Sequence, residues 1–402
     1  MGEILTLPWS VRSPSKPYPS AVATTLTAHE LTVGRRERHP VLALIRHVDL
    51  ALIGSAVALG LIGIVMVYSA TKSVYGHYYL ERQFVWIALG IVTMIVVMMI
   101  DYRRYQQLGY MIYGLVVLSL VGVFVVGKSA QGAQRWYQLG ALQLQPSEFA
   151  AIGLIIAVAT FSSRRKGVLE FREMIALLVL AGLPMVLVYL QPDLGTTIIL
   201  GVTMSAMLVA AGVRVRYLVM LAVMVVGGFF LAIHLHVLKP YQLERLTSFL
   251  HQSQGTQGPN YDLAMSKATI SSGGFHGTGL FKGSSTNLGY VPNQQTDFIF
   301  SAVGEQLGFV GGAVVIGLFG IIALRALRAA QMARDNFGRM VCAGALAFVA
   351  FSVFENIGMT IGLAPITGIP LPFISYGGSA SFAFFATVGL VANVEMRRAV
   401  RK

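Results

Sequence analysis

Long apolar stretches, separated by short polar segments, run along this chain from Leu50 to Val394. A helix needs about 17–25 mostly apolar residues to cross the hydrocarbon layer of a membrane. Most of the stretches reach that length once their interfacial residues are included, so the pattern predicts about ten membrane-spanning helices. They are residues 50–69, 84–100, 108–126, 149–161, 174–190, 196–211, 218–233, 309–324, 340–361 and 379–394.

The polar segments between these stretches alternate in chemistry. One segment carries arginines, and the next carries a motif rich in Pro, Gly and polar residues. The arginine segments are 101–107, 162–173, 212–217 and 325–339, and both tails are basic as well. Because Lys and Arg beside a span stay on the cytoplasmic side, we expect these segments and both termini in the cytoplasm. Every motif-rich segment is then extracytoplasmic.

These boundaries predict three parts of the chain. Residues 1–47, rich in Ser, Pro and Thr, are typical of a disordered cytoplasmic tail. Residues 48–396 form the membrane domain, and 397–402 form a basic cytoplasmic tail. The N-terminal tail contains no cleavable signal peptide, so the first span is expected to act as an uncleaved anchor. The expected fold class is all-α, a polytopic membrane helix bundle with a large extracytoplasmic loop.

That loop, residues 234–297, is much longer than the other polar segments. Loops beyond about 12–15 residues are uncommon and usually functional. Leu and Phe recur at helical spacing within 241–250, which predicts an amphipathic helix on the membrane surface. Residues 261–270 predict a second helix. The glycines of 271–283 allow sharp turns or close approach to a ligand, and a simply flexible loop is the alternative.

Composition supports a membrane protein and excludes several other classes. Hydrophobic residues make up 55% of the chain and charged residues 12%, against about 25% charged in soluble domains. The net charge of +13 is explained by membrane orientation, so we expect contact with membrane lipid and no nucleic-acid binding. The single Cys342 excludes an intrachain disulfide. The chain has no HExxH, Walker or GxGxxG motif, which disfavours a zinc hydrolase and a nucleotide-driven pump.

Acidic residues are few and are unfavourable inside a membrane. Five of them are predicted at the outer ends of spans: Glu148, Asp193, Asp297, Glu305 and Glu355. Asp297 opens an apolar run that is longer than one span needs. At the membrane boundary its pKa should rise, which suits a general base, and its oxygens also suit a metal ligand.

Two alternatives stay open for these acids. Thr296 or Asp297 is also a suitable N-cap for a helix that begins at Phe298. Glu305 is suited either to share a cation with Asp297 or to hydrogen-bond between helices.

Some basic residues are predicted on the outer side, although Lys and Arg beside spans favour the cytoplasmic side. They are Lys72, Arg82, Lys128, Arg135, Lys239, Arg245, Lys267 and Lys282. Such groups favour an anionic ligand such as a phosphate or pyrophosphate, although exported loops also need charge for solubility. Arg135, followed by Trp136 in a segment bounded by glycines, is the strongest candidate.

Taken together, the outer motifs resemble the SEDS family, which contains the RodA and FtsW proteins of bacterial cell-wall synthesis. The motifs are GAQRWYQLGALQLQPSEF (132–149), QPDLGT (191–196), SSGGFHGTGL (271–280), TDFIFSAVGEQLGF (296–309) and NIGMTIGLAPITGIPLPFISYGGSA (356–380). They occur in the family's order and cover nearly the whole chain. The second and the last look more like the RodA branch.

The resemblance implies a peptidoglycan glycosyltransferase. Such an enzyme polymerises lipid II, an undecaprenyl-pyrophosphate-linked substrate, into lipid-linked glycan strands on the outer face of the cytoplasmic membrane, for elongation, cell shape or division. It also implies a divalent cation, Mg²⁺ or Mn²⁺, and a class B penicillin-binding protein as partner. A lipid II flippase or transporter is the alternative function, and a non-catalytic scaffold is a third.

The resemblance also implies roles for single residues. Asp297 matches the essential acid of the family's TDFIF motif. A second motif is matched by Arg135, Trp136, Gln145, Ser147 and Glu148. Lys267 matches a basic position of the large loop, and with Arg135 and Arg245 it is a candidate for stabilising the leaving pyrophosphate. Asp297 with Glu305 is the candidate metal pair.

The chain departs from the family's pattern in two places. Ala151 stands where the family often has a lysine, and Asn293 and Gln295 replace the glutamate and histidine that often precede the TDF motif. The missing carboxylate weakens any metal site built from that pair. It favours Asp297 as a base, or a partner carboxylate at Glu305 or Glu148.

Overall fold

The computed structural model describes residues 47–130, 133–139, 142–165, 170–235, 243, 245, 249 and 258–398. All of these lie in one compact unit, Leu44–Lys402. The predicted N-terminal tail is outside the described residues apart from His47. Of the predicted C-terminal tail, the structure describes Arg397 and Arg398, which are the last two residues of the final helix.

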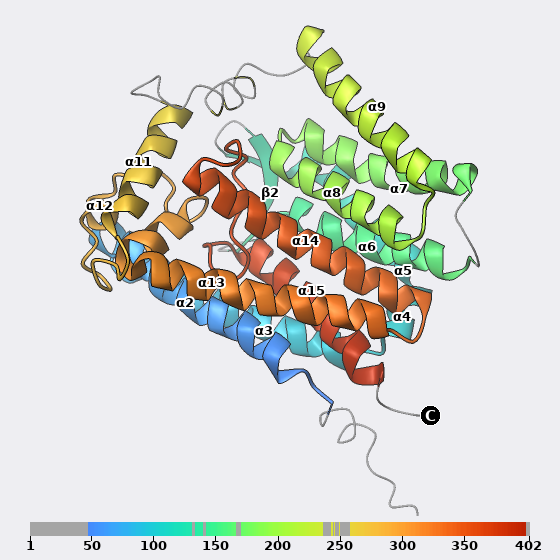
Figure 1. The fold of residues 1–402 in the computed structure, drawn as a ribbon, viewed down its shortest axis with the longest axis horizontal. Coiled ribbons are helices and arrows are strands. Elements are labelled where there is room, and N and C mark those ends of the chain that lie inside the picture. Colours follow the sequence, from blue (N-terminus) through green and yellow to red (C-terminus); the bar gives the residue numbers. More distant parts are fainter. Residues whose placement is uncertain are drawn as a thin grey trace, which may run out of the picture. The chain divides into compact units, whose positions relative to one another are not determined.

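Helices dominate the described part of the chain (Figure 1). They are α2 (Leu50–Tyr75), α3 (Tyr78–Met99), α4 (Tyr102–Gln107), α5 (Gly109–Val126), α6 (Ser147–Ser163), α7 (Phe171–Leu190), α8 (Leu194–Ala210), α9 (Val215–His234), α11 (Pro259–Ser272), α12 (Ser284–Leu288), α13 (Ile299–Met332), α14 (Asn336–Ile361) and α15 (Gly378–Arg398). Three short strands stand between α5 and α6: β1 (Lys128–Ala130), β2 (Ala133–Leu139) and β3 (Leu142–Leu144).

The predicted spans coincide with helices. Within the described residues, seven helices are long and apolar enough to cross a membrane: α2, α3, α5, α7, α13, α14 and α15. The shorter apolar helices are α6, α8 and Val215–Gly228 of α9. Each predicted span falls on one of these ten helices, so the predicted class, a multi-pass helical membrane bundle, is confirmed.

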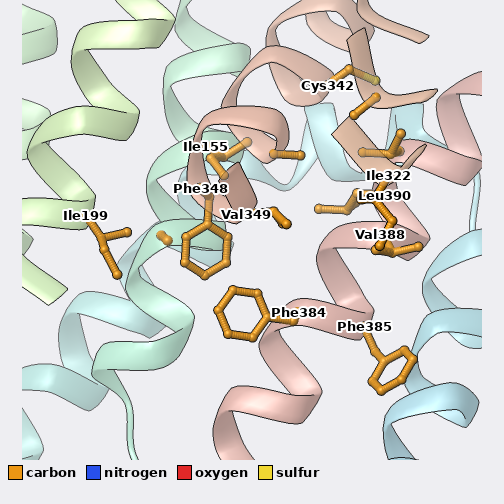
Figure 2. Packing of buried hydrophobic residues seen from close by; sticks show 14 of the residues in the cluster. Ile155, Ile199, Ile322, Cys342, Phe348, Val349, Phe384, Phe385, Val388 and Leu390 are labelled. Atoms are coloured by element: carbon orange, nitrogen blue, oxygen red, sulfur yellow. The ribbon is translucent and has the colours of Figure 1, made fainter. Parts of the chain in front are cut away.

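Helix α15 lies inside the bundle. It packs most extensively against α3 and also contacts α2, α6, α13 and α14. Close packing of small residues and rings replaces lipid contact here. Figure 2 shows Phe348 of α14 facing Phe384 of α15, and their ring centroids are 4.8 Å apart. A Cβ on Gly389 would lie 2.7 Å from the carbonyl oxygen of Met94 in α3, so the two backbones are nearly in contact.

Helix α13 is broken near its N-terminal end. Gly308 has φ 65° and ψ −163°, a conformation that only glycine adopts readily. The glycine-rich loop after α11 crosses the break and satisfies the backbone groups that it frees. Thr278 N–H donates to Glu305 O at 2.9 Å, and Phe309 N–H donates to Gly274 O at 3.0 Å. The break explains why the apolar run after Asp297 is longer than one span.

The three strands form an antiparallel sheet in the order β1-β2-β3. The hydrophobic pattern of the sequence does not predict these strands. Tyr137 pairs with Leu144 in the β2–β3 register, and its hydroxyl donates to Ser119 O in α5 at 2.8 Å. The sheet is therefore fixed on the end of α5, and it carries Arg135 and Trp136 in β2.

An ion pair ties α2 to α13 at the end of the bundle that carries the arginines. Asp49 caps α2, because its Oδ1 accepts from Ala51 N–H and Leu52 N–H, both at 3.1 Å. Its Oδ2 pairs with the Nε of Arg325. The Asp49 side chain is almost fully buried, whereas Arg325 is partly exposed.

Replacing Arg325 by methionine is expected to lower stability. The change keeps an apolar stem but leaves the buried Asp49 carboxylate without its cation, a loss of about 1.5–3 kcal/mol for a hydrogen bond to a charged group. Thermal unfolding of the purified protein in detergent measures it. Arg328→Met, at an exposed position of α13, is the control. Equal midpoints for the two variants would contradict the prediction.

Candidate functional site

A cavity of about 450 Å³ brings several of the predicted site residues together. Its polar walls come from β2, the starts of α6 and α8, and the turn before α13; α3 and the start of α15 supply other parts. Three carboxylates, two arginines and four aromatic residues line it. They are Glu148, Asp193 and Asp297; Arg82 and Arg135; and Tyr79, Trp86, Trp136 and Tyr376.

Asp297 reaches this cavity from a turn and is not a helix cap. The N-cap of α13 is Phe298, which has no side-chain capping bond. The backbone of the turn closes on itself, because Asp297 N–H donates to Asn293 O at 3.1 Å. The N-cap alternative for Asp297 is therefore not supported, and its carboxylate is left to face the cavity.

The surroundings of Asp297 raise its pKa above that of an ordinary aspartate. Burial is the largest cause, since it penalises the charged form, and nearby Asp193 adds to it. The hydroxyl of Thr296 and the guanidinium groups of Arg245 and Arg135 act in the opposite direction. Such a carboxylate is a better proton acceptor than a solvated one once it is ionised.

Arg135 both lines the cavity and ties two elements together. Its Nε donates to Gln191 O at 2.8 Å, and its Nη2 donates to Pro192 O. These bonds join β2 to the turn before α8. Part of the guanidinium is thus used for structure, and the rest of the group borders the cavity.

The predicted Gln145 and Ser147 form a network with Asp193. Ser147 Oγ donates to Asp193 Oδ2 at 3.1 Å, and Gln145 Nε2 donates to the same oxygen at 3.3 Å. Trp136 Nε1 donates to Gln145 Oε1 at 3.0 Å. Ser147 is fully buried and does not line the cavity. Its role is therefore to orient Asp193, whereas Trp136 and Gln145 also face the cavity.

Asp193 is a functional candidate to which the sequence motifs assigned no role. It caps α8, because its Oδ1 accepts from Thr196 N–H at 3.2 Å, and its Oδ2 accepts from the network. With both oxygens engaged it is suited to shape the site. The signal was present in the sequence, since Asp193 stands in the QPDLGT motif, which was predicted to lie at the outer end of a span.

A stripe on α3 was predicted only in part, because Arg82 was named among the outer basic residues, whereas Tyr79 and Trp86 were not named. Tyr79, Arg82 and Trp86 stand at helical spacing and line the cavity together. The Arg82 guanidinium lies 4.4 Å from the ring centroid of Tyr78. Among the described residues no carboxylate forms an ion pair with it. Arg82 is thus an arginine at the cavity without a paired acid.

Glu305 lies apart from this cavity. Its carboxylate accepts from Ser285 N–H at 2.8 Å, and from Thr286 N–H and Oγ1 at 3.0 and 2.5 Å. These bonds hold α12 against α13, which matches the structural alternative for this residue. Asp297 and Glu305 are not brought together on one cation. In the part of the chain that is described, no three His, Cys, Asp or Glu side chains gather as a metal site.

The two basic candidates of the large loop differ in position. Lys267 lies on an exposed face of α11 and does not line the cavity. Arg245 does approach it: a Cβ added at Gly368 would lie 3.3 Å from Asp297 Oδ2 and 3.8 Å from Arg245 Nη1. The predicted surface helix 241–250 lies mostly outside the described residues. The predicted helix 261–270 is confirmed as part of α11.

Comparisons with known proteins agree on one family. A family described as cell cycle protein and named for FtsW, RodA and SpoVE matches residues 49–400. The probable peptidoglycan glycosyltransferase FtsW of Trichlorobacter lovleyi is 36% identical over 360 residues, covering 86% of this chain and 92% of that protein. The peptidoglycan glycosyltransferase MrdB of Escherichia coli K12 is 34% identical over 352 residues, covering 88% and 94%.

A solved structure gives the same result. It is a chain from work on the structural coordination of polymerization and crosslinking by a peptidoglycan synthase complex. It superposes with a TM-score of 0.74 at 29% identity, covering 88% of this chain and 98% of that one.

Proposed function

This chain belongs to the SEDS family of FtsW, RodA and SpoVE proteins, and we propose that it polymerises lipid II at the cavity around Asp297. Membership of the family makes it a multi-pass membrane peptidoglycan glycosyltransferase. The observation that supports the site is the placement of a half-buried acid, Asp297, among arginines and aromatic rings in one cavity.

The proposed reaction joins two lipid-linked sugars. The acceptor hydroxyl loses its proton to the Asp297 carboxylate as its oxygen bonds to the anomeric carbon of the donor. The bond from that carbon to the pyrophosphate oxygen breaks, and lipid pyrophosphate leaves with the electron pair. Arg82, Arg135 and Arg245 would stabilise the charge that develops on it. Trp136, Trp86 and Tyr79 offer apolar faces beside the sugars.

A divalent cation, Mg²⁺ or Mn²⁺, stays a separate proposal. Both carboxylate oxygens of Asp193 accept hydrogen bonds, and Glu305 lies outside the cavity, so Asp297 and Glu148 are the remaining candidate ligands. The pair of Asp297 with Glu305 does not fit a metal site, and no step above depends on a metal. Loss of polymerisation in EDTA that either metal restores would support the cation; full activity in EDTA would remove it.

We further propose that the cavity faces the outside of the cytoplasmic membrane and that both termini are cytoplasmic. A cysteine at Ser253 should then react with an impermeant maleimide on intact cells. A cysteine at Arg172, in an arginine segment, should react only after permeabilisation. The reverse pattern would invert the topology and place Asp297 on the wrong side for an exported substrate.

A class B penicillin-binding protein is the proposed partner. The structural neighbour from a peptidoglycan synthase complex supports this, since that complex coordinates polymerization with crosslinking. The direct test of function is incubation of purified lipid II with the purified protein in vesicles, with and without the partner. Glycan chains would support a polymerase. Movement of lipid II between leaflets without chain formation would instead favour the transporter.

Gly368→Ala is expected to lower polymerisation at least about tenfold. Gly368 has φ 76°, and a Cβ there would press within 3.3 Å of Asp297 Oδ2, so both the loop and the carboxylate must shift. Gly289→Ala is the matched control, because Gly289 has φ 67° but open space around it. Equal losses in both variants would mean that backbone strain alone, and not crowding of Asp297, explains the effect.

A further inference from the structure

Three consecutive carbonyl groups in the turn that carries Asp297 accept hydrogen bonds from outside the turn. Tyr376 N–H donates to Gln295 O at 2.9 Å. Ser375 Oγ donates to Thr296 O at 2.5 Å. The amide of Asn356 donates to Asp297 O at 2.8 Å. The backbone of the turn is therefore held at each residue from Gln295 to Asp297.

Asn356 differs from the other two donors in its position and reach. It stands five residues before the end of α14, and its side chain is fully buried. The same Nδ2 also donates to Ile369 O at 2.7 Å. One side-chain amide thus joins the Asp297 turn to the segment that contains Gly368, which lies against the Asp297 carboxylate.

The residue before it strengthens this attachment. Glu355 Oε1 accepts from Thr367 Oγ1 at 3.0 Å, so α14 fixes the same segment one residue before Gly368. Two neighbouring side chains of α14 therefore hold both segments that border the Asp297 carboxylate. One is the turn that carries Asp297, and the other is the backbone from Thr367 to Ile369.

The chemistry of this position calls for an amide. Both carbonyls need a donor, and Asn supplies two N–H donors on one short, neutral group. A carboxylate would repel both carbonyls, and an apolar side chain would leave them unpartnered. The Oδ1 of Asn356 has no hydrogen-bond partner among the described residues. An unpartnered buried acceptor is unfavourable, so packing alone does not account for asparagine here.

We infer that Asn356 is a positioning residue for polymerisation, which sets the direction of the Asp297 carboxylate by joining its turn to the Ile369 segment. Asn356 does not line the cavity, so it acts through Asp297 and not on the substrate. The inference rests on the proposed function, and it adds a residue from a helix interior to the site.

The test compares Asn356→Leu, which keeps the branching at Cγ but removes both donors, with Asn356→Ser, which offers a single hydroxyl donor. Lipid II polymerisation is measured in vesicles over a range of substrate concentrations. We expect kcat to fall in the order wild type, Ser, Leu, by about 10- to 100-fold for Leu. KM should stay within threefold, because the walls that bind substrate are unchanged.

The control is Ser352→Ala, one turn earlier on α14. Ser352 is equally buried, but its hydroxyl bonds only within the helix, to Phe348 O at 2.8 Å. It should keep the wild-type kcat. If Asn356→Leu does not fold, the Ser variant carries the test alone.

Two results would overturn the inference. One is wild-type kcat in both Asn356 variants. The other is a KM that rises as much as kcat falls, which would indicate general collapse of the cavity. The proposed function fails separately: in that case the wild-type protein itself makes no glycan in the same vesicles.

Discussion

Asp297→Asn is expected to reduce glycan polymerisation by about 10²–10⁴-fold, the range for loss of a general acid–base group. The substitution keeps the size of the side chain but removes its ability to accept the acceptor sugar's proton. Arg82, Arg135 and the rings would still line the cavity, so binding of lipid II should persist. The measurements are chain formation from lipid II and, separately, binding of lipid II to the variant.

The fold should tolerate this change. Burial raises the pKa of Asp297, so its ionised form is unfavourable in the folded protein at neutral pH. A neutral amide removes that penalty, and thermal stability should equal or exceed that of the wild type. Asp262→Asn is the matched control. Asp262 lies in α11, where burial raises its pKa and Arg245 opposes that effect, yet it does not line the cavity.

Wild-type activity in the Asp297→Asn variant would overturn the catalytic assignment, and so would an equal loss in Asp262→Asn. The pH profile provides a further check. The base must be ionised, so kcat/KM should fall as the pH drops through the pKa of Asp297. Because that pKa is raised, the fall should begin at a higher pH than for an ordinary aspartate. A profile that is flat through that range would contradict the assignment.

Gly308→Ala is expected to prevent stable folding. The φ and ψ of Gly308 lie in a region that is essentially restricted to glycine, which alone costs about 1–3 kcal/mol for another residue. A Cβ there would also lie 2.3 Å from Gly277 N, and backbone atoms cannot give way as a flexible side chain does. The loop would be pushed off the break in α13, freeing the backbone groups that it now satisfies.

The effect can be measured as the fraction of monodisperse protein recovered in detergent, with the melting temperature of whatever is recovered. Gly277→Ala should behave similarly, because its φ is 82° and its Cβ would lie 2.2 Å from Gln306 O. Gly317→Ala in the same helix faces open space and should match the wild type. Normal yield and stability for Gly308→Ala would contradict the role given to the break.

The helices could be predicted because the membrane imposes a length and a composition on each one. The predicted span 108–126 differs from α5 by a single residue at its start. The sheet was missed because β2 and β3 are short, and a short run of mixed polar and apolar residues has no period that separates it from a loop. The break at Gly308 was missed because its cause is a contact with a loop about thirty residues earlier.

The site was predictable only in part. Asp297, Arg135, Trp136, Gln145 and Glu148 were named from the sequence, and the cavity gathers them. Glu305 and Lys267 were named as well, but chain position alone could not tell that one holds α12 and the other lies on an exposed face of α11. The role of Asn356 could not be predicted, because the sequence does not indicate which backbone carbonyl groups an asparagine within an apolar helix will donate to.

The interior location of α15 has a consequence for how the gene tolerates change. Its residues from Ser379 to Val394 are nearly all buried, and its backbone almost touches α3. Most substitutions there, including bulkier apolar ones, should be eliminated in a saturation library. By contrast, α9 exposes residues such as Val219, Val223 and Val225, and there exchange among apolar side chains should be nearly silent. Substitutions should therefore accumulate much more slowly in α15 than in α9, although the two helices have similar lengths.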